Sequence, residues 1–134
     1  MEIVKTIKEK LCMIVQTSGG ADRESKERES AIKELKKPIK YLLPDSKAIE
    51  IGEEKYLGPE ILFYPDKIGH EYMGIHELII SSIKKADLDL KKDLYESIYL
   101  AGATSKFPGL ATRILNELKE MKLDNVKVRS IVIE

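Results

Sequence analysis

Apolar residues recur at helical spacing at the start of the chain. They form one stripe, with charged side chains on the opposite face, and the stripe comprises Ile3, Val4, Ile7, Leu11 and Ile14. This pattern predicts an amphipathic helix that ends before a flexible Ser-Gly-Gly sequence at residues 18–20. Residues 21–37 are almost wholly charged, with acidic and basic side chains four positions apart. We expect this segment to be a solvated helix or a mobile insertion, ended by Pro38.

Two short β-prone runs follow, at residues 39–43 and 47–51. The Pro-Asp-Ser sequence between them is typical of a turn, so the two runs are predicted to form a hairpin. Residues 58–63 are predicted to be a short helix, because Pro59 is tolerated in a first helical turn.

A helix is expected at residues 75–85, where apolar residues again recur at helical spacing. Its stripe comprises Ile75, Leu78, Ile79 and Ile83. Asp87 or Asp89 can cap a further short helix that runs through Tyr95, because either carboxylate can accept the first free backbone N–H groups.

The last part of the chain predicts a strand, a helix and a strand, at residues 97–101, 108–121 and 126–133. The inward positions of the helix are Leu110, Ile114, Leu118 and Met121. This order predicts a βαβ unit with parallel strands. The fold class is therefore α/β. A parallel pair normally has more neighbouring strands and both faces covered, so we expect the chain to be part of something larger.

Composition limits the function classes. The 134 residues include 23 Lys and Arg and 23 Asp and Glu, so the net charge is zero, whereas a generic nucleic-acid binder would carry a basic excess. The single cysteine, Cys12, excludes an internal disulfide framework and a Cys-rich zinc site. The two histidines are too few for a metal site. No apolar run approaches the roughly 18 residues of a membrane span, so a soluble, intracellular protein is expected.

Two places in the sequence could carry chemistry. One is the glycine-containing loop at residues 102–109, which joins a strand to a helix and could let a nucleotide approach the backbone and the helix N-terminus. The other is the polar face of the first helix, where Lys5, Lys8 and Glu9 cluster. Its carboxylate could accept hydrogen bonds from ribose hydroxyls. The simpler interpretations remain a tight turn and a solvated helix face.

Several stretches match motifs of actin in order and spacing. Residues 3–12 (IVKTIKEKLC) resemble the actin segment IVRDIKEKLC. Further matches, in the same order, are residues 41–45, 49–52, 59–63, 74–77, 89–95 (DLKKDLY), 100–104 (LAGAT) and 107–109 (FPG). The resemblance covers nearly the whole chain except a charged insertion at about residues 16–40. Residues 49–52, 65–66 and 68–69 look nearer to centractin-type actin-related proteins than to conventional actin.

The resemblance implies a partial actin-like ATPase fold, which is RNase H-like. Residues 1–70 would form a small helix-plus-hairpin lobe similar to subdomain 4 of the family. Residues 71–134 would form a βαβ piece of the larger lobe, similar to part of subdomain 3. In this family ATP or ADP, with Mg²⁺, lies in the cleft between lobes.

The resemblance also implies a nucleotide site made from the two places singled out above. By positional match, Lys5, Lys8 and Glu9 would contact adenine and ribose from one side, and the other side would be lined by Gly102, Ala103, Thr104, Lys106 and Phe107. The family's phosphate-holding hairpins, and its acidic residues near magnesium, match no part of this chain. We therefore expect no catalytic or metal residue here, and weak or no nucleotide binding by the chain alone. The full-length family member would be a slow ATPase.

Three functional interpretations remain open, and the third is a soluble α/β domain of unrelated function. In the first, the chain is a fragment of an actin-related protein with a cytoskeletal or complex-assembly role, in the cytoplasm or alternatively the nucleus. Its partners would be other actin-fold subunits or assembly partners, with no nucleic acid and no membrane. In the second, it is an actin-fold scaffold that uses no nucleotide, with the charged insertion as a docking element. Ala103 and Lys106, where the family has glycine and an aliphatic residue, favour the scaffold. Four residues favour the nucleotide: Lys8, Glu9, Thr104 and Phe107.

Overall fold

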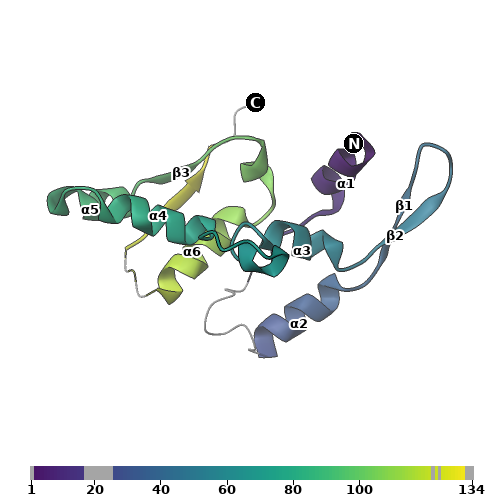
Figure 1. Cartoon of the computed structure of the whole chain (residues 1–134), viewed down its shortest axis with the longest axis horizontal. Coiled ribbons are helices and arrows are strands. Elements are labelled where there is room, and N and C mark those ends of the chain that lie inside the picture. Colours follow the sequence, from purple (N-terminus) through teal and green to yellow (C-terminus); the bar gives the residue numbers. More distant parts are fainter. Residues whose placement is uncertain (1, 17–25, 122, 124, 132–134) are drawn as a thin grey trace.

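Six α-helices, two 3₁₀ turns and four strands make up the part of the chain that the computed structural model describes, residues 2–16, 26–121, 123 and 125–131. In chain order they are α1 (Glu2–Leu11), α2 (Lys26–Leu35), β1 (Ile39–Leu42), β2 (Ala48–Ile51), α3 (Glu54–Glu60), η1 (Pro65–Ile68), α4 (Ile75–Lys84), α5 (Leu88–Tyr95), β3 (Ile98–Leu100), η2 (Ala103–Lys106), α6 (Leu110–Glu120) and β4 (Val128–Ser130). In Figure 1, α1, α2 and the β1–β2 hairpin lie on one side of the molecule, and α4, α5, α6 and β3 lie on the other.

The first helix ends earlier than its apolar stripe predicts. α1 stops at Leu11 and buries none of its residues, and Val4 is 68% exposed. Ile14 and Val15 are buried, but they lie in the extended segment that follows the helix. There the backbone turns to other elements, because the Met13 N–H donates to the Lys55 carbonyl (2.9 Å). The prediction that Ile14 belongs to the helix was therefore wrong.

The charged segment forms α2 over residues 26–35, one of the two forms expected, while residues 21–25 lie outside the described residues. The predicted hairpin is confirmed, with Ile39 opposite Ile51 in an antiparallel pair. Its turn is held by a hydrogen bond from the Lys47 N–H to Asp45 Oδ1 (3.1 Å). An aspartate that bonds the backbone two residues on is a common way to close such a turn.

The third helix corrects the sequence prediction, because it begins at Glu54 and places Pro59 in its last turn. Proline has no N–H and would ordinarily leave the carbonyl of the residue four positions earlier unpaired. Here that carbonyl belongs to Lys55, and it accepts the Met13 N–H instead. A contact from a distant segment therefore allows proline where a local interpretation places a helix start.

Helix α4 follows the prediction in extent and in three of its four inward positions, because Ile83 is buried and Ile75 and Ile79 pack against the core. Its buried residues are His76, Ile80 and Ile83, whereas Leu78, which was predicted to face inward, is 48% exposed. Helix α5 begins after Asp87 as expected, although the Asp87 side chain makes no capping hydrogen bond.

The predicted βαβ unit is confirmed: β3 and β4 pair in parallel, with Ile98 opposite Val128, and α6 connects them. Leu110, Ile114 and Leu118 are 3% exposed or less. Met121 caps the end of the helix and is 47% exposed, so its predicted inward position was wrong.

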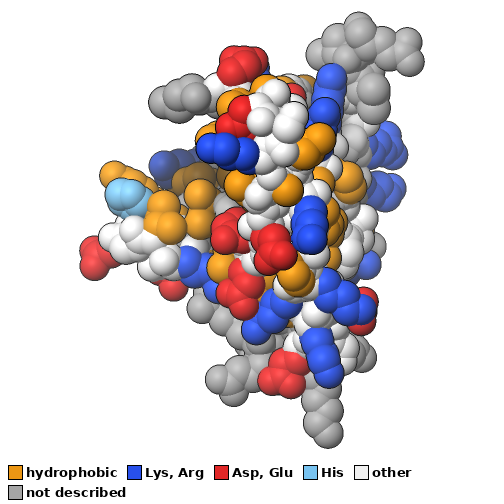
Figure 2. All heavy atoms as spheres, turned by 90° about the vertical axis from the view of Figure 1, so that its right-hand side faces the viewer, with side chains coloured by type: hydrophobic (Ala, Val, Ile, Leu, Met, Phe, Trp, Pro, Cys, Tyr) orange, Lys and Arg blue, Asp and Glu red, His pale blue; other side chains and the backbone are white. Residues whose placement is uncertain are grey.

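One buried cluster gathers residues from both halves of the chain. Its members are Ile14, Phe63, Ile80, Leu110, Ile114, Leu118 and Val126. Ile14 and Phe63 thus pack with α6, although they precede the lobe boundary predicted near residue 70, and that boundary stays a prediction. On the surface that faces the right-hand side of Figure 1, acidic and basic side chains are interspersed and hydrophobic side chains are exposed between them (Figure 2).

Candidate functional site

A cavity of about 330 Å³ lies between the polar face of α1 and the turn that leads into α6. It is lined by Lys8, Glu9, Ala103, Thr104, Lys106, Phe107 and Pro108. Six of the eight residues singled out in the sequence are in this lining. Lys5 and Gly102 are exposed and are not among the lining residues. Two segments about 95 positions apart in the sequence therefore form the walls of one cavity.

The turn wall depends on two glycines. Gly102 has a φ of 99° and Gly109 a φ of 81°, which lie in the left-handed region that side chains disfavour. Between them, the Ser105 Oγ donates to the Gly102 carbonyl (2.6 Å), which closes the η2 turn. Two left-handed glycines thus flank the η2 turn, whose residues and successors Thr104, Lys106 and Phe107 line the cavity.

The helix wall is supplied by adjacent residues on the polar face of α1. Lys8 and Glu9 are both exposed side chains, so they keep their freedom to meet a ligand. A carboxylate accepts hydrogen bonds from hydroxyl and amino groups, and an ammonium donates up to three. Opposite them, Phe107 and Pro108 provide apolar surface. This mixture of one acceptor, cationic donors and a flat apolar wall suits a ligand with a planar ring and hydroxyl groups.

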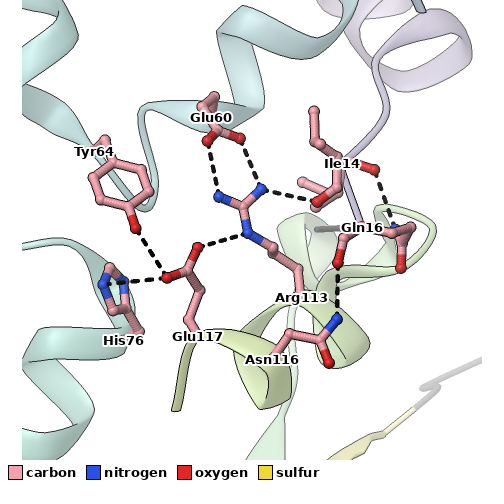
Figure 3. Close-up of polar contacts among 9 residues, drawn as sticks. Ile14, Gln16, Glu60, Tyr64, His76, Arg113, Asn116 and Glu117 are labelled. Atoms are coloured by element: carbon pink, nitrogen blue, oxygen red, sulfur yellow. Dashed lines mark hydrogen bonds and ion pairs between the residues drawn. The ribbon is translucent and has the colours of Figure 1, made fainter. Parts of the chain in front are cut away.

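A buried polar cluster, which no pattern in the sequence predicted, surrounds one side of α6 (Figure 3). Its centre is Arg113 of α6, which is 0% exposed. The guanidinium donates to both carboxylate oxygens of Glu60 (2.8 Å each) and, through Nε, to Glu117 Oε1 (2.8 Å). Nη1 also donates to the Val15 carbonyl (2.8 Å). One cation thus joins α3, α6 and the segment after α1.

The positive charge of Arg113 faces the carboxylates of both Glu60 and Glu117. Burial by itself lowers the pKa of Arg113, but hydrogen bonds and the negative charges of Glu60 and Glu117 outweigh it, so the pKa lies above its ordinary value. The planar fork of arginine suits this bidentate pairing better than the point charge of lysine. The only hint in the sequence was that Arg113 and Glu117 lie four positions apart, on the same stripe of α6 as Ile114 and Leu118.

His76 lies at the edge of the same cluster. Its Nε2 is 3.9 Å from Glu117 Oε2, which also accepts a hydrogen bond from the Tyr64 hydroxyl (2.9 Å). Burial lowers the pKa of His76, and the negative charge of Glu117 only partly opposes this shift. Among the described residues, His76 Nδ1 is a buried atom without a hydrogen-bond partner. A neutral imidazole in a packing role fits this environment.

Three other features of the described residues bear on the predictions made from the sequence. No three His, Cys, Asp or Glu side chains among them come together to hold a metal ion, and none of their helices has the length and apolar character to cross a membrane. Cys12 is half-buried beside a second cavity, of about 550 Å³. Burial raises the pKa of its thiol, which makes it a poor nucleophile.

Comparisons with known proteins identify the family. The family model described as Actin matches residues 1–134. An "Actin-like protein" from Neurospora crassa is 35% identical over 128 residues, which is 96% of this chain and 33% of the relative. The chain thus spans about a third of the length of that relative. A family match over the whole chain agrees with the mixture of helices and small sheets in the structure, which fits a partial α/β actin-like fold. The chain belongs to the actin family.

Proposed function

We propose that this chain forms one side of an ATP-binding cleft in an actin-related protein, with α1 and the turn at residues 102–108 on either side of the adenosine. The observation that supports this is the shared cavity: Lys8 and Glu9 line it together with Thr104 and Phe107, although they are far apart in the sequence. Membership of the actin family makes a nucleotide the natural occupant.

The residues of the cavity fit such a ligand. Glu9 would accept hydrogen bonds from the ribose hydroxyls, and Phe107 and Pro108 would pack against the purine. Lys8 and Lys106 would supply positive charge near the phosphates or the ring nitrogens. Lys5 and Gly102 would act from outside the lining, Lys5 on the same helix face and Gly102 by shaping the turn.

Within this proposal, hydrolysis and tight binding belong to a longer actin-fold protein, because phosphoryl transfer needs groups that stabilise charge on the phosphates together with Mg²⁺. The present chain would bind Mg-ATP weakly. Its proposed role in the cell is cytoskeletal or complex assembly in the cytoplasm, with other actin-fold subunits or assembly partners. A nuclear location and a centractin-type subfamily also remain predictions.

The second candidate, an actin-fold scaffold that uses no nucleotide, is favoured by two side chains in the same cavity. The Ala103 methyl and the Lys106 side chain both occupy lining positions, where they reduce the space for a purine. In this alternative the charged helix α2 would dock a protein partner.

Titration of the ¹⁵N-labelled chain with Mg-ATP, followed by NMR, separates the two candidates. Nucleotide binding predicts a dissociation constant on the order of 1 mM and amide shifts confined to both cavity walls. The shifts should disappear in Glu9→Ala and persist in Glu2→Ala, a matched control that removes an exposed glutamate from the same helix outside the cavity lining. Unchanged wild-type spectra at about ten times that concentration would contradict the proposed binding by this chain, and the same result with a longer actin-fold protein that includes it would favour the scaffold.

A further inference from the structure

The position of α1 depends on the segment that follows it. The helix itself buries no residue, whereas Ile14 is 5% and Val15 1% exposed. The segment is also held through its backbone, since the Met13 N–H donates to the Lys55 carbonyl of α3 (2.9 Å). Any force that fixes the α1 wall of the cavity therefore acts largely through residues 13–16.

Two side chains of α6 hold the carbonyl groups of this segment (Figure 3). Arg113 Nη1 donates to the Val15 carbonyl and Asn116 Nδ2 to the Gln16 carbonyl, each at 2.8 Å. The Gln16 side chain also lies directly over Gly109, where a Cβ would overlap it. We call Arg113 and Asn116 the α6 clamp.

Within the α6 clamp, the Arg113 side chain is held in a fixed orientation. The Arg113 guanidinium is fixed by two hydrogen bonds to Glu60 and one to Glu117, so Nη1 has a single direction open to it. Helix α6 also begins directly after the turn that forms the other cavity wall. The clamp thus connects α1 to the very helix that carries the opposite wall.

We propose that Arg113 and Asn116 are positioning residues that set the separation of the two cavity walls and thereby control nucleotide affinity. This inference rests on the proposed function for its ligand. Neither residue is among those that line the cavity, so an effect of either on binding would act through the segment at residues 13–16.

The decisive variant is Asn116→Asp, which keeps the shape of the side chain but replaces its N–H donor by an oxygen that repels the Gln16 carbonyl. Arg113→Lys, which keeps the charge but loses the fork, is the second variant. The control is Ile83→Val, which loosens the core on α4 away from the clamp. Circular dichroism establishes that each variant is folded.

Two readouts are needed. Without ligand, amide hydrogen exchange of α1 should be about fivefold faster in Asn116→Asp than in Ile83→Val, the effect expected from one lost hydrogen bond. With Mg-ATP, NMR titration should show binding about fivefold weaker in Asn116→Asp and weaker still in Arg113→Lys.

The outcomes distinguish this inference from the proposed function. Equal α1 exchange in Asn116→Asp and Ile83→Val, or equal Mg-ATP affinity, would overturn the clamp even if wild type binds. Faster α1 exchange in Asn116→Asp, together with no wild-type response to Mg-ATP, would support the positioning of α1 by the clamp. It would overturn the proposal that the clamp controls nucleotide affinity. If Arg113→Lys fails to fold, Asn116→Asp decides alone.

Discussion

Arg113 of α6 and Glu60 of α3 lie 53 residues apart in the sequence and are joined by two hydrogen bonds of 2.8 Å each, with side chains that are 0% and 2% exposed. The pair ties the helix that follows the cavity turn to the helix that follows the hairpin. It joins segments that precede and follow the lobe boundary predicted near residue 70.

Removing the Arg113 guanidinium should strongly destabilise the fold. Arg113→Ala leaves the Glu60 and Glu117 carboxylates buried without their shared partner, which predicts a loss of about 3–5 kcal/mol in the free energy of unfolding. Urea unfolding measures it. Glu34→Gln, which breaks the exposed pair with Lys37, is the control and should leave the midpoint unchanged. A loss under about 1 kcal/mol in Arg113→Ala would mean that water replaces the guanidinium.

His76 should make stability depend on pH. Burial places the pKa of His76 in the folded chain below the ordinary value of 6.5, against the opposing charges of Glu117, Glu77 and Glu60. Between these two pKa values the unfolded chain binds more protons, so the free energy of unfolding falls as the pH drops below about 6.5. For one proton the slope is at most about 1.4 kcal/mol per pH unit.

Urea unfolding between neutral and mildly acidic pH tests the His76 prediction. The slope in this window should flatten in His76→Gln and stay as in wild type in His70→Gln, which replaces an exposed histidine. A His76→Gln curve parallel to wild type would show that other groups carry the pH dependence.

Two glycines should differ in how far the same substitution changes stability. A Cβ on Gly74 would overlap the Phe63 carbonyl, so Gly74→Ala should destabilise the fold by about 1–3 kcal/mol or more. A Cβ on Gly58, inside α3, would meet no atom beyond its chain neighbours, but Pro59 follows it and disfavours helical geometry for a preceding residue that has a Cβ. The gain in helix propensity and this clash oppose each other, so Gly58→Ala should change the free energy of unfolding by less than about 1 kcal/mol. Thermal unfolding compares the two variants, and a tolerated Gly74→Ala would contradict the close approach.

Two residues predicted from the sequence to face inward on α6 should also differ. Ile114 is 0% exposed, so Ile114→Ala should cost about 2–5 kcal/mol. Met121 is 47% exposed, so Met121→Ala should change stability by no more than about 0.5 kcal/mol. Chemical unfolding compares them directly. Similar losses at both positions would place Met121 in the core.

Local sequence patterns predicted the helices and strands that depend on residues close together in the sequence. The spacing of Leu110, Ile114 and Leu118 found α6, and the Pro-Asp-Ser turn found the hairpin. These patterns gave the wrong helix bounds where a residue far away in the sequence stabilises the structure. Pro59 lies inside α3 because Met13 takes the carbonyl that proline leaves free, and no pattern near Pro59 contains that information.

The same limit applies to the site. Spacing alone gave two weak candidates, and only the resemblance to actin placed Glu9 and Thr104 in one site, where the structure now has them lining one cavity. Arg113 and Glu117 escaped notice because charged residues four positions apart on a helix are typical of a solvated surface. Their burial depends on Glu60 and Val15, which come from other parts of the chain.

The most direct test of the proposed cleft is affinity labelling with ATP whose ribose has been oxidised to a dialdehyde, which reacts with nearby amines. After reduction, peptide mass spectrometry identifies the modified lysines. A ribose held between α1 and the turn predicts labelling of Lys8 or Lys106 above the exposed Lys40 and Lys47, with protection by unmodified Mg-ATP. Equal labelling of all four lysines, unaffected by Mg-ATP, would contradict the account.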